Sequence, residues 1–162
     1  MSTYLFKIFI IGLKNSRISE LVDRELRGGF VVDTSLINGV DFRIKTVQVN
    51  ERTCTLQSWV VDLNKNLERF YFFYHSYIIG SLGAILLMYL GDRKSFTILQ
   101  EWISFIRESV KVIPILLVGN RPKVDQERQI SEEEGNKFAR EHELAGYMEI
   151  ASHNGYNMSN MF

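Results

Sequence analysis

Polar residues that could bind a ligand follow three apolar runs, each typical of a buried strand. The three groups begin at Gly12, at Asp62 and at Gly119–Asn120. In doubly wound α/β sheets, ligands bind beyond the carboxyl ends of the strands. Lys14 and Arg17 follow the first run, so a local anion site is compatible with a net charge of zero. These positions are therefore the candidates for a ligand site.

Other reactive side chains do not predict a metal or catalytic centre. His75, His142 and His153 show no metal-ligand spacing. Glu132–Glu134 stand where a helix is expected to begin, and acidic residues are favourable at that end of a helix dipole. The single cysteine, Cys54, excludes an intramolecular disulfide framework and fits a reducing, intracellular setting.

Strands and helices that would position these residues alternate along the chain. Apolar runs predict buried strands at 4–11, 82–90, 113–118 and 147–150. A β-hairpin is expected from 41–50 and 54–62, joined by Asn50-Glu51-Arg52. Helical spacing predicts helices at 19–27, 93–110 and 131–143, the last with Ser131 and Glu134 as a capping box. This alternation predicts a doubly wound, mostly parallel α/β sheet.

Length and charge limit the classes of protein to which the chain can belong. Its 162 residues suit one domain spanning 1–162, which can bury about 70% of its unfolded surface. The 19 Lys plus Arg balance 19 Asp plus Glu, which excludes a broadly basic nucleic-acid-binding protein. Residues 71–91 carry no charged side chain, over a length close to that of a membrane span. Gly80 and Gly83 interrupt them, so an aromatic helix or loop followed by a strand is expected instead.

Six segments in chain order resemble the Rab family of small GTPases. They are YLFKIFIIG (4–12), NGVDFRIKTV (38–47), LQSW (56–59), ERF (68–70), RKSF (93–96) and LLVGN (116–120). The resemblance covers nearly the whole chain and implies a Ras-like, P-loop NTPase fold, with a mostly parallel six-stranded sheet flanked by helices. The chain stops where the family's last helix would be starting, so that helix is expected to be absent or truncated.

The phosphate loop of that family reads G-x-x-x-x-G-K-[ST], where the Lys neutralises phosphates and the hydroxyl holds Mg²⁺. Gly12 and Ser19 fill the outer positions and, with Lys14 and Arg17, are candidate nucleotide-binding residues. Arg17 stands in place of the second Gly, where a positive φ would strain a bulky residue. Ile18 stands in place of the Lys and has no charge. A weakened phosphate site is therefore predicted, with compensation by Lys14 and Arg17 as the alternative.

The family's magnesium and hydrolysis positions are altered as well. Ser19 and Asp62 could hold Mg²⁺ if a nucleotide binds, but Ile37 stands in place of the Mg²⁺-ligating Thr. Lys65 stands in place of the Gly that senses the γ-phosphate, and residues 66–67 in place of the water-positioning Gln. Without that Gln and the phosphate-loop Lys, efficient hydrolysis is not expected.

The guanine-binding motif N-K-x-D reads Asn120-Arg121-Pro122-Lys123. The family's Asp accepts two hydrogen bonds from guanine, whereas Lys123 can only donate. Losing two charge-assisted bonds of about 1.5 to 3 kcal/mol each would remove most guanine preference. Asn120 and the backbone N–H of Ser152 remain as candidate base contacts, with Asp125 as an alternative acceptor.

An aromatic surface is the best preserved feature of the resemblance. Phe42, Trp59 and Tyr77 match the triad through which Rab proteins engage effectors, and Phe70 and Phe73 add further rings. Such rings favour protein interfaces because they bury a large area with few rotatable bonds. We expect at least two rings of this aromatic cluster to be exposed.

Three functions are open on these residues. The motif losses favour a pseudoGTPase of Rab fold: a protein-binding module in vesicle trafficking or signalling, in which guanine-nucleotide binding and hydrolysis are weak or lost and no cofactor is expected. The alternative is an atypical Rab GTPase that binds GTP or GDP with Mg²⁺ through other contacts and hydrolyses slowly. A third possibility is an unrelated doubly wound domain such as a receiver, but Gly12-Leu13-Lys14 offers no acidic pair after the first strand.

The expected partners are proteins. Effectors or scaffolds would bind the aromatic surface, and a second copy or a second G domain would cover the sheet face left by the last helix. Neither nucleic acid nor a direct membrane anchor is expected. The expected location is cytoplasmic, and peripheral at endomembranes through partners.

Overall fold

The computed structural model of the chain describes residues 3–26, 40–63, 71–110 and 112–162, without the side chains of residues 71–73. One sheet has the strand order β2-β3-β1-β4-β5-β6. Its strands are β1 (Tyr4–Gly12), β2 (Val40–Val49), β3 (Arg52–Asp62), β4 (Gly83–Tyr89), β5 (Ile115–Asn120) and β6 (Gly146–Ile150). The β2–β3 pair is antiparallel, and the other four pairs are parallel. The predicted mostly parallel, six-stranded α/β fold is confirmed.

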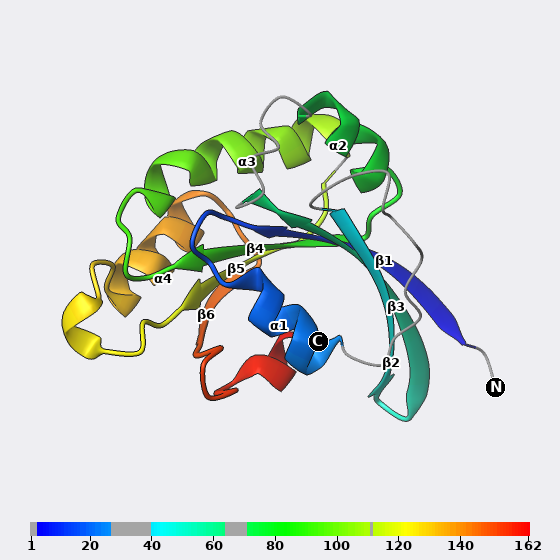
Figure 1. The fold of residues 1–162 in the computed structure, drawn as a ribbon. Helices are drawn as coiled ribbons and strands as arrows, with labels where there is room; N and C mark the ends of the chain where they lie inside the picture. Colours follow the sequence, from blue (N-terminus) through cyan, green and yellow to red (C-terminus); the bar gives the residue numbers. More distant parts are fainter. Residues whose placement is uncertain (1–2, 27–39, 64–70, 111) are drawn as a thin grey trace.

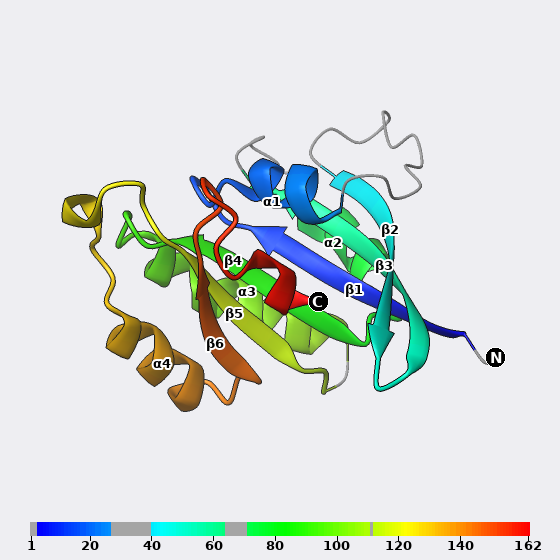
Figure 2. The same cartoon turned by 90° about the horizontal axis from the view of Figure 1, so that it is seen from below.

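Helices cover both faces of this sheet (Figure 1). They are α1 (Ile18–Glu25), α2 (Tyr71–Ile78), α3 (Ser95–Ser109) and α4 (Glu132–Glu141), with 3-10 helices η3 (Asp125–Glu127) and η4 (Met158–Met161). Helices α2 and α3 cover one face, and α4 contacts α3 through Phe138 and Phe96. Helix α1 and η4 lie on the other face, in front of the sheet in Figure 2.

Each face of the sheet carries its own apolar core. Phe9 packs in the core beneath α3, and its neighbour Ile10 packs in the core beneath α1; both are fully buried. Successive side chains of a strand point to opposite faces, so a strand covered on both sides needs a continuous apolar run. The apolar run at 4–11 therefore reflects the two-sided burial of the inner part of β1.

The hairpin connection differs from its prediction. Asn50 and Glu51 have φ values of 47° and 63°, and Arg52 already belongs to β3. Positive φ at both central residues gives the two-residue turn whose twist matches the strands of a hairpin. The connection is therefore one residue shorter than the three residues expected.

The uncharged segment 71–91 divides into α2, a short connection and β4. Within the described ranges, no helix is long and apolar enough to span a membrane. The expectation of an aromatic helix followed by a strand is confirmed.

The predicted capping box of α4 is present. Ser131 Oγ accepts from the Glu134 N–H at 3.1 Å, and the Glu134 carboxylate accepts from the Ser131 N–H at 2.9 Å. Arg93 adds an ion pair to Glu134 at 2.8 Å. Hydrogen bonding from Arg93 and then from Ser131 lowers the pKa of Glu134 to about 2.

Replacing Ser131 with Ala is expected to cost about 1 kcal/mol of unfolding free energy, because it leaves one N–H of the first helical turn without its acceptor. Urea unfolding measures this loss. Ser159, which is exposed, gives the matched control. Equal losses for Ser131→Ala and Ser159→Ala would contradict the role of the cap.

Candidate functional site

The sheet brings the predicted strand ends to one edge. Gly12 at the end of β1 lies opposite Asp62 of β3 and Leu87 of β4. Asn120 ends β5 and lies opposite Tyr89 of β4. The three groups of polar residues therefore begin at the same edge of the sheet, at the carboxyl ends of β1, β3 and β5.

The loop from β1 to α1 has the backbone shape expected at Arg17. This residue has φ 59° and ψ 40°, in the left-handed region that favours glycine. Its Nη1 lies 3.4 Å from Glu20 Oε1. Ser19 is exposed in the first turn of α1, and Lys14 is exposed in the loop. Lys14 lines a cavity of about 730 Å³ between this loop and α3.

Ile18, which replaces the phosphate-loop lysine, is part of the apolar core. Its side chain is 2% exposed and packs with the core residues beneath α1. A Cβ added to Gly12 would lie 2.4 Å from Ile18 Cβ, so the isoleucine sits directly against the end of β1. The side chain at position 18 therefore contributes to packing and has no hydrogen-bond donor.

Asn120 holds the strand-end loops together. Its Nδ2 donates to Ser16 O at 2.9 Å and to Ser152 Oγ at 2.8 Å. Its Oδ1 accepts from the Ser152 backbone N–H at 3.0 Å. Asn120, Ser16 and Ser152 are all buried. The Ser152 N–H, which the resemblance assigns to a base oxygen, is thus engaged within the chain.

Glu20 completes this network. Sequence reasoning missed this role, because the only local signal is an acidic residue in a first helical turn. Ser152 Oγ donates to Glu20 Oε2 at 2.5 Å. This hydrogen bond, with the charges of Arg17 and Lys123, outweighs partial burial and lowers the pKa of Glu20. Glu20 is therefore a carboxylate beside the two residues that were predicted to bind a base.

Arg121, in place of the N-K-x-D lysine, turns toward β6. Its Nε donates to Glu149 Oε2 at 2.8 Å, and its guanidinium lies 4.8 Å from the Tyr156 ring centroid. Arg128 and Tyr147 also donate to Glu149, so this buried carboxylate has three partners. Lys123 and Asp125 are both exposed.

The predicted metal ligands come from two elements. Ser19 is on α1, and Asp62 is the last residue of β3. Among the residues that the structure describes, no cluster of three or more His, Cys, Asp or Glu could hold a metal ion. Ile37, Lys65, residues 66–67 and Phe70 lie outside the described residues. So does the side chain of Phe73, whose backbone is in α2.

The predicted aromatic triad forms a continuous row of tilted ring contacts, which we call the aromatic stack. The ring centroids of Phe42 and Trp59 are 4.7 Å apart, and those of Trp59 and Tyr77 are 5.1 Å apart. Phe42 is buried, whereas Trp59 and Tyr77 are half-buried. Tyr74 of the same cluster is buried, and its ring centroid lies 5.9 Å from that of Trp102. Among the rings of this cluster that the structure describes, only Trp59 and Tyr77 are partly exposed, so they form the aromatic surface at this point.

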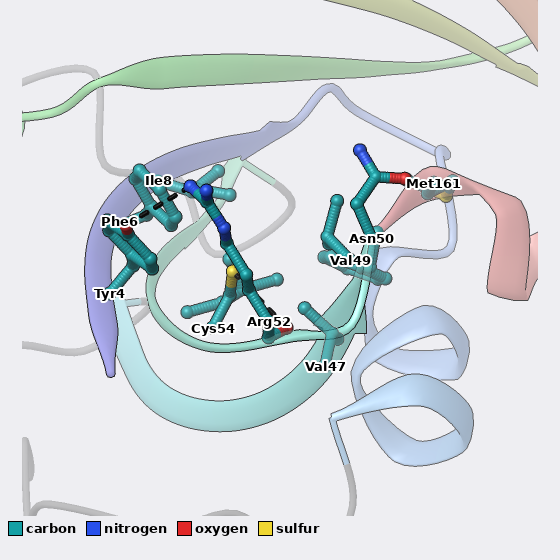
Figure 3. Close-up of a pocket in the computed structure, with 11 residues that line it drawn as sticks. Tyr4, Phe6, Ile8, Val47, Val49, Asn50, Arg52, Cys54 and Met161 are labelled. Carbon is teal, nitrogen blue, oxygen red and sulfur yellow. Dashed lines mark hydrogen bonds between the residues drawn. The ribbon is translucent and has the colours of Figure 1, made fainter. Parts of the chain in front are cut away.

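A second hollow lies on the α1 face of β1, β2 and β3 (Figure 3). Its volume is about 620 Å³, and its lining is mostly apolar, including Phe6, Val47 and Met161. Arg52 closes one side, where its Nη1 donates to Tyr4 Oη at 3.1 Å.

Comparison with known proteins assigns a family to the whole chain. The model of the Ras family matches residues 7–162. Ras-related protein Rab-11C of Dictyostelium discoideum is 30% identical over 98% of this chain and 70% of its own length. Ras-related protein RABA6b of Arabidopsis thaliana is 33% identical over 98% of this chain and 68% of its own. Ras-related protein Rab-13 of Bos taurus is 30% identical over 98% of this chain and 77% of its own.

Proposed function

Because this chain belongs to the Ras family, as a Rab-type member of that superfamily, we propose that it is a pseudoGTPase: a Rab-fold module that binds proteins in trafficking or signalling and has lost guanine-nucleotide binding and hydrolysis. Members of the family bind GTP or GDP with Mg²⁺. This chain departs from them at the positions of the phosphate-loop lysine and the guanine-binding aspartate.

The network around Glu20 carries this proposal. Asn120 and Ser152 hydrogen-bond to one another, and the Ser152 hydroxyl donates a hydrogen bond to the Glu20 carboxylate. A base that displaced these hydrogen bonds would lose their free energy and would lie beside the Glu20 carboxylate. Guanine presents donors to the family's Asp, but Lys123 at that position is a cation.

The phosphate side of the site, like the base side, does not fit a nucleotide. Ile18 is buried in the core and cannot neutralise a phosphate. Arg17 points one guanidinium nitrogen toward Glu20, which offsets part of its charge.

The protein-binding role rests on the aromatic stack. Phe42 contacts Trp59, and Trp59 contacts Tyr77. Trp59 and Tyr77 are half-buried, whereas Phe42 is buried. Half-buried Trp and Tyr side chains are typical anchors of protein interfaces. Through such partners the protein would be peripheral at endomembranes.

The competing function is an atypical GTPase, and one observation favours it. Arg17 adopts the left-handed conformation in the β1–α1 loop, with Lys14 exposed beside it. A loop with this backbone and two basic residues could still meet a phosphate.

Thermal unfolding with millimolar GDP and Mg²⁺ distinguishes the two functions. A ligand at 100 times its Kd stabilises a protein by about 2.7 kcal/mol, which is about 5 to 10 °C for a chain of this size. We expect no shift for this protein and a clear shift for a nucleotide-binding Ras-family protein treated in the same way. Micromolar binding of a fluorescent GTP analogue, weakened by Lys14→Ala or Arg17→Ala, would establish the atypical GTPase instead.

A further inference from the structure

Three exposed aliphatic side chains gather around one lysine on the α2 face of β1. Leu5 is 58% exposed, Ile79 52% and Leu82 55%, and they are the exposed leucines and isoleucines of the described residues. The Leu82 N–H donates to Lys7 O at 2.8 Å, and Lys7 Nζ donates to Ile79 O at 2.6 Å. Leu5 lies two residues before Lys7 on the strand and so shares its face. We call Leu5, Lys7, Ile79 and Leu82 the Lys7 patch.

The patch continues into the aromatic stack. Lys7 Nζ lies 5.6 Å from the centroid of the Trp59 ring, and Trp59 contacts Tyr77. Leu82 follows α2 by a short connection, so strand β1 and the end of α2 share this surface. Concentration of exposed aliphatic groups beside half-buried aromatic rings is typical of an interaction surface.

Lys7 gives the patch a positive charge, which favours a negatively charged group on the partner. Its ammonium has three N–H donors, and the backbone carbonyl of Ile79 takes one of them. Burial lowers the pKa of Lys7, because surrounding side chains replace part of its water. A carboxylate is the group that would complement this ammonium.

We propose that the Lys7 patch, together with Trp59 and Tyr77, docks an amphipathic partner helix that places one Asp or Glu on Lys7 and aliphatic side chains around it. The proposal deepens the protein-binding role proposed above, since it names the chemistry of the partner. A single lysine among aliphatic groups fits a protein segment better than an anionic membrane, which selects clusters of four to eight basic residues.

The charge of Lys7 is expected to contribute a large part of the binding free energy. Removing one member of a desolvated, hydrogen-bonded charge pair at an interface costs about 2 kcal/mol or more. Lys7→Met keeps most of the aliphatic stem and removes the charge. Binding should therefore weaken by at least about 30-fold.

Selection from a phage-displayed library of helix-forming peptides tests this surface on the full chain. We expect enriched peptides to carry one acidic residue flanked by aliphatic ones. Their affinity should fall in Lys7→Met and in Ile79→Ser, and be unchanged in Lys137→Met, whose exposed lysine pairs with Glu141 on α4. Replacing the acidic residue of the peptide by its amide should weaken binding to the natural chain but not to Lys7→Met.

Several outcomes would overturn the proposal. They are failure to enrich any peptide, enriched peptides without an acidic residue, and peptides that bind Lys7→Met as tightly as the natural chain. Lys7-dependent binding to phosphatidylserine vesicles or Lys7-dependent self-association, in the absence of peptide binding, would assign the patch to a membrane or to a second copy. Nucleotide titration of the same preparations separates the two proposals, because GTP binding would end the pseudoGTPase proposal without affecting peptide binding.

Discussion

Replacing Glu149 with Gln is expected to lower the free energy of unfolding by about 3 kcal/mol, because it removes the charge that joins two arginines. Glu149 is 6% exposed at the end of β6. Arg121 and Arg128 donate to Oε2 at 2.8 Å and 3.0 Å, Arg128 also donates to Oε1, and Tyr147 donates to Oε1 at 2.8 Å. Removing one partner of a buried ion pair costs about 3 to 5 kcal/mol. Both arginines are partly exposed and can regain water, which places the loss at the lower end.

The same residue predicts a pH dependence. Burial would raise the pKa of Glu149, but the hydrogen bonds from Arg128, Arg121 and Tyr147 outweigh it and lower that pKa below its ordinary value. A carboxyl whose folded pKa is lowered stabilises the fold above its unfolded pKa, and this stability is lost as the pH falls through the folded pKa. The natural chain should lose this part of its stability in acid, whereas Glu149→Gln should not.

Urea unfolding at neutral and acidic pH measures both effects. Glu141→Gln is the matched control, because Glu141 is 58% exposed and lies 3.7 Å from Lys137 within one helix. An exposed pair of this kind contributes about 0.3 to 0.5 kcal/mol. A loss below about 1 kcal/mol for Glu149→Gln would contradict the assignment of Glu149 as the centre of a buried network.

Asn120→Ala is expected to cost about 2 to 4 kcal/mol even without any nucleotide. The substitution leaves Ser16 O and the Ser152 N–H without the partners that they have in the fold. Each buried polar group that loses its partner costs about 1 to 3 kcal/mol. Asn120 thus has a structural role here that is independent of a ligand.

Denaturant unfolding of Asn120→Ala measures this cost. Asn136→Ala is the control, since Asn136 is half-buried on α4 and donates only to Glu132 O within its own helix among the hydrogen bonds described. We expect a change of about 0.5 kcal/mol or less for it. Indistinguishable stabilities for the two variants would show that the Asn120 bonds are not maintained in solution.

Much of the fold could be predicted from local sequence. Residues 8–11 place apolar side chains on both faces of a strand, and Ser131 with Glu134 has the spacing of a capping box. Such patterns depend on periodicities of two and 3.6 residues, which the chain expresses locally. The predicted length of the hairpin connection was wrong by one residue. Asn50 and Glu51 both adopt positive φ, so Arg52 already belongs to the strand.

The candidate site could be predicted only in part. Motif spacing identified Gly12, Asn120 and Ser152 as neighbours of one edge, and the sheet register places their strands side by side. Glu20 could not be found in this way, because its partner Ser152 is 132 residues away. Hydrogen bonding at that separation depends on how α1 packs against the loop after β6.

The order of strands and helices, the resemblance to Rab proteins and the altered motif positions follow from the amino-acid sequence. The burial of Ile18, the hydrogen bond between Glu20 and Ser152, and the position of Ile79 and Leu82 beside Lys7 follow only from the fold. Burial and the choice of partner depend on groups that the fold brings together from distant elements. Residue type limits what each group can donate or accept, and the packing of the sheet and helices selects its partner.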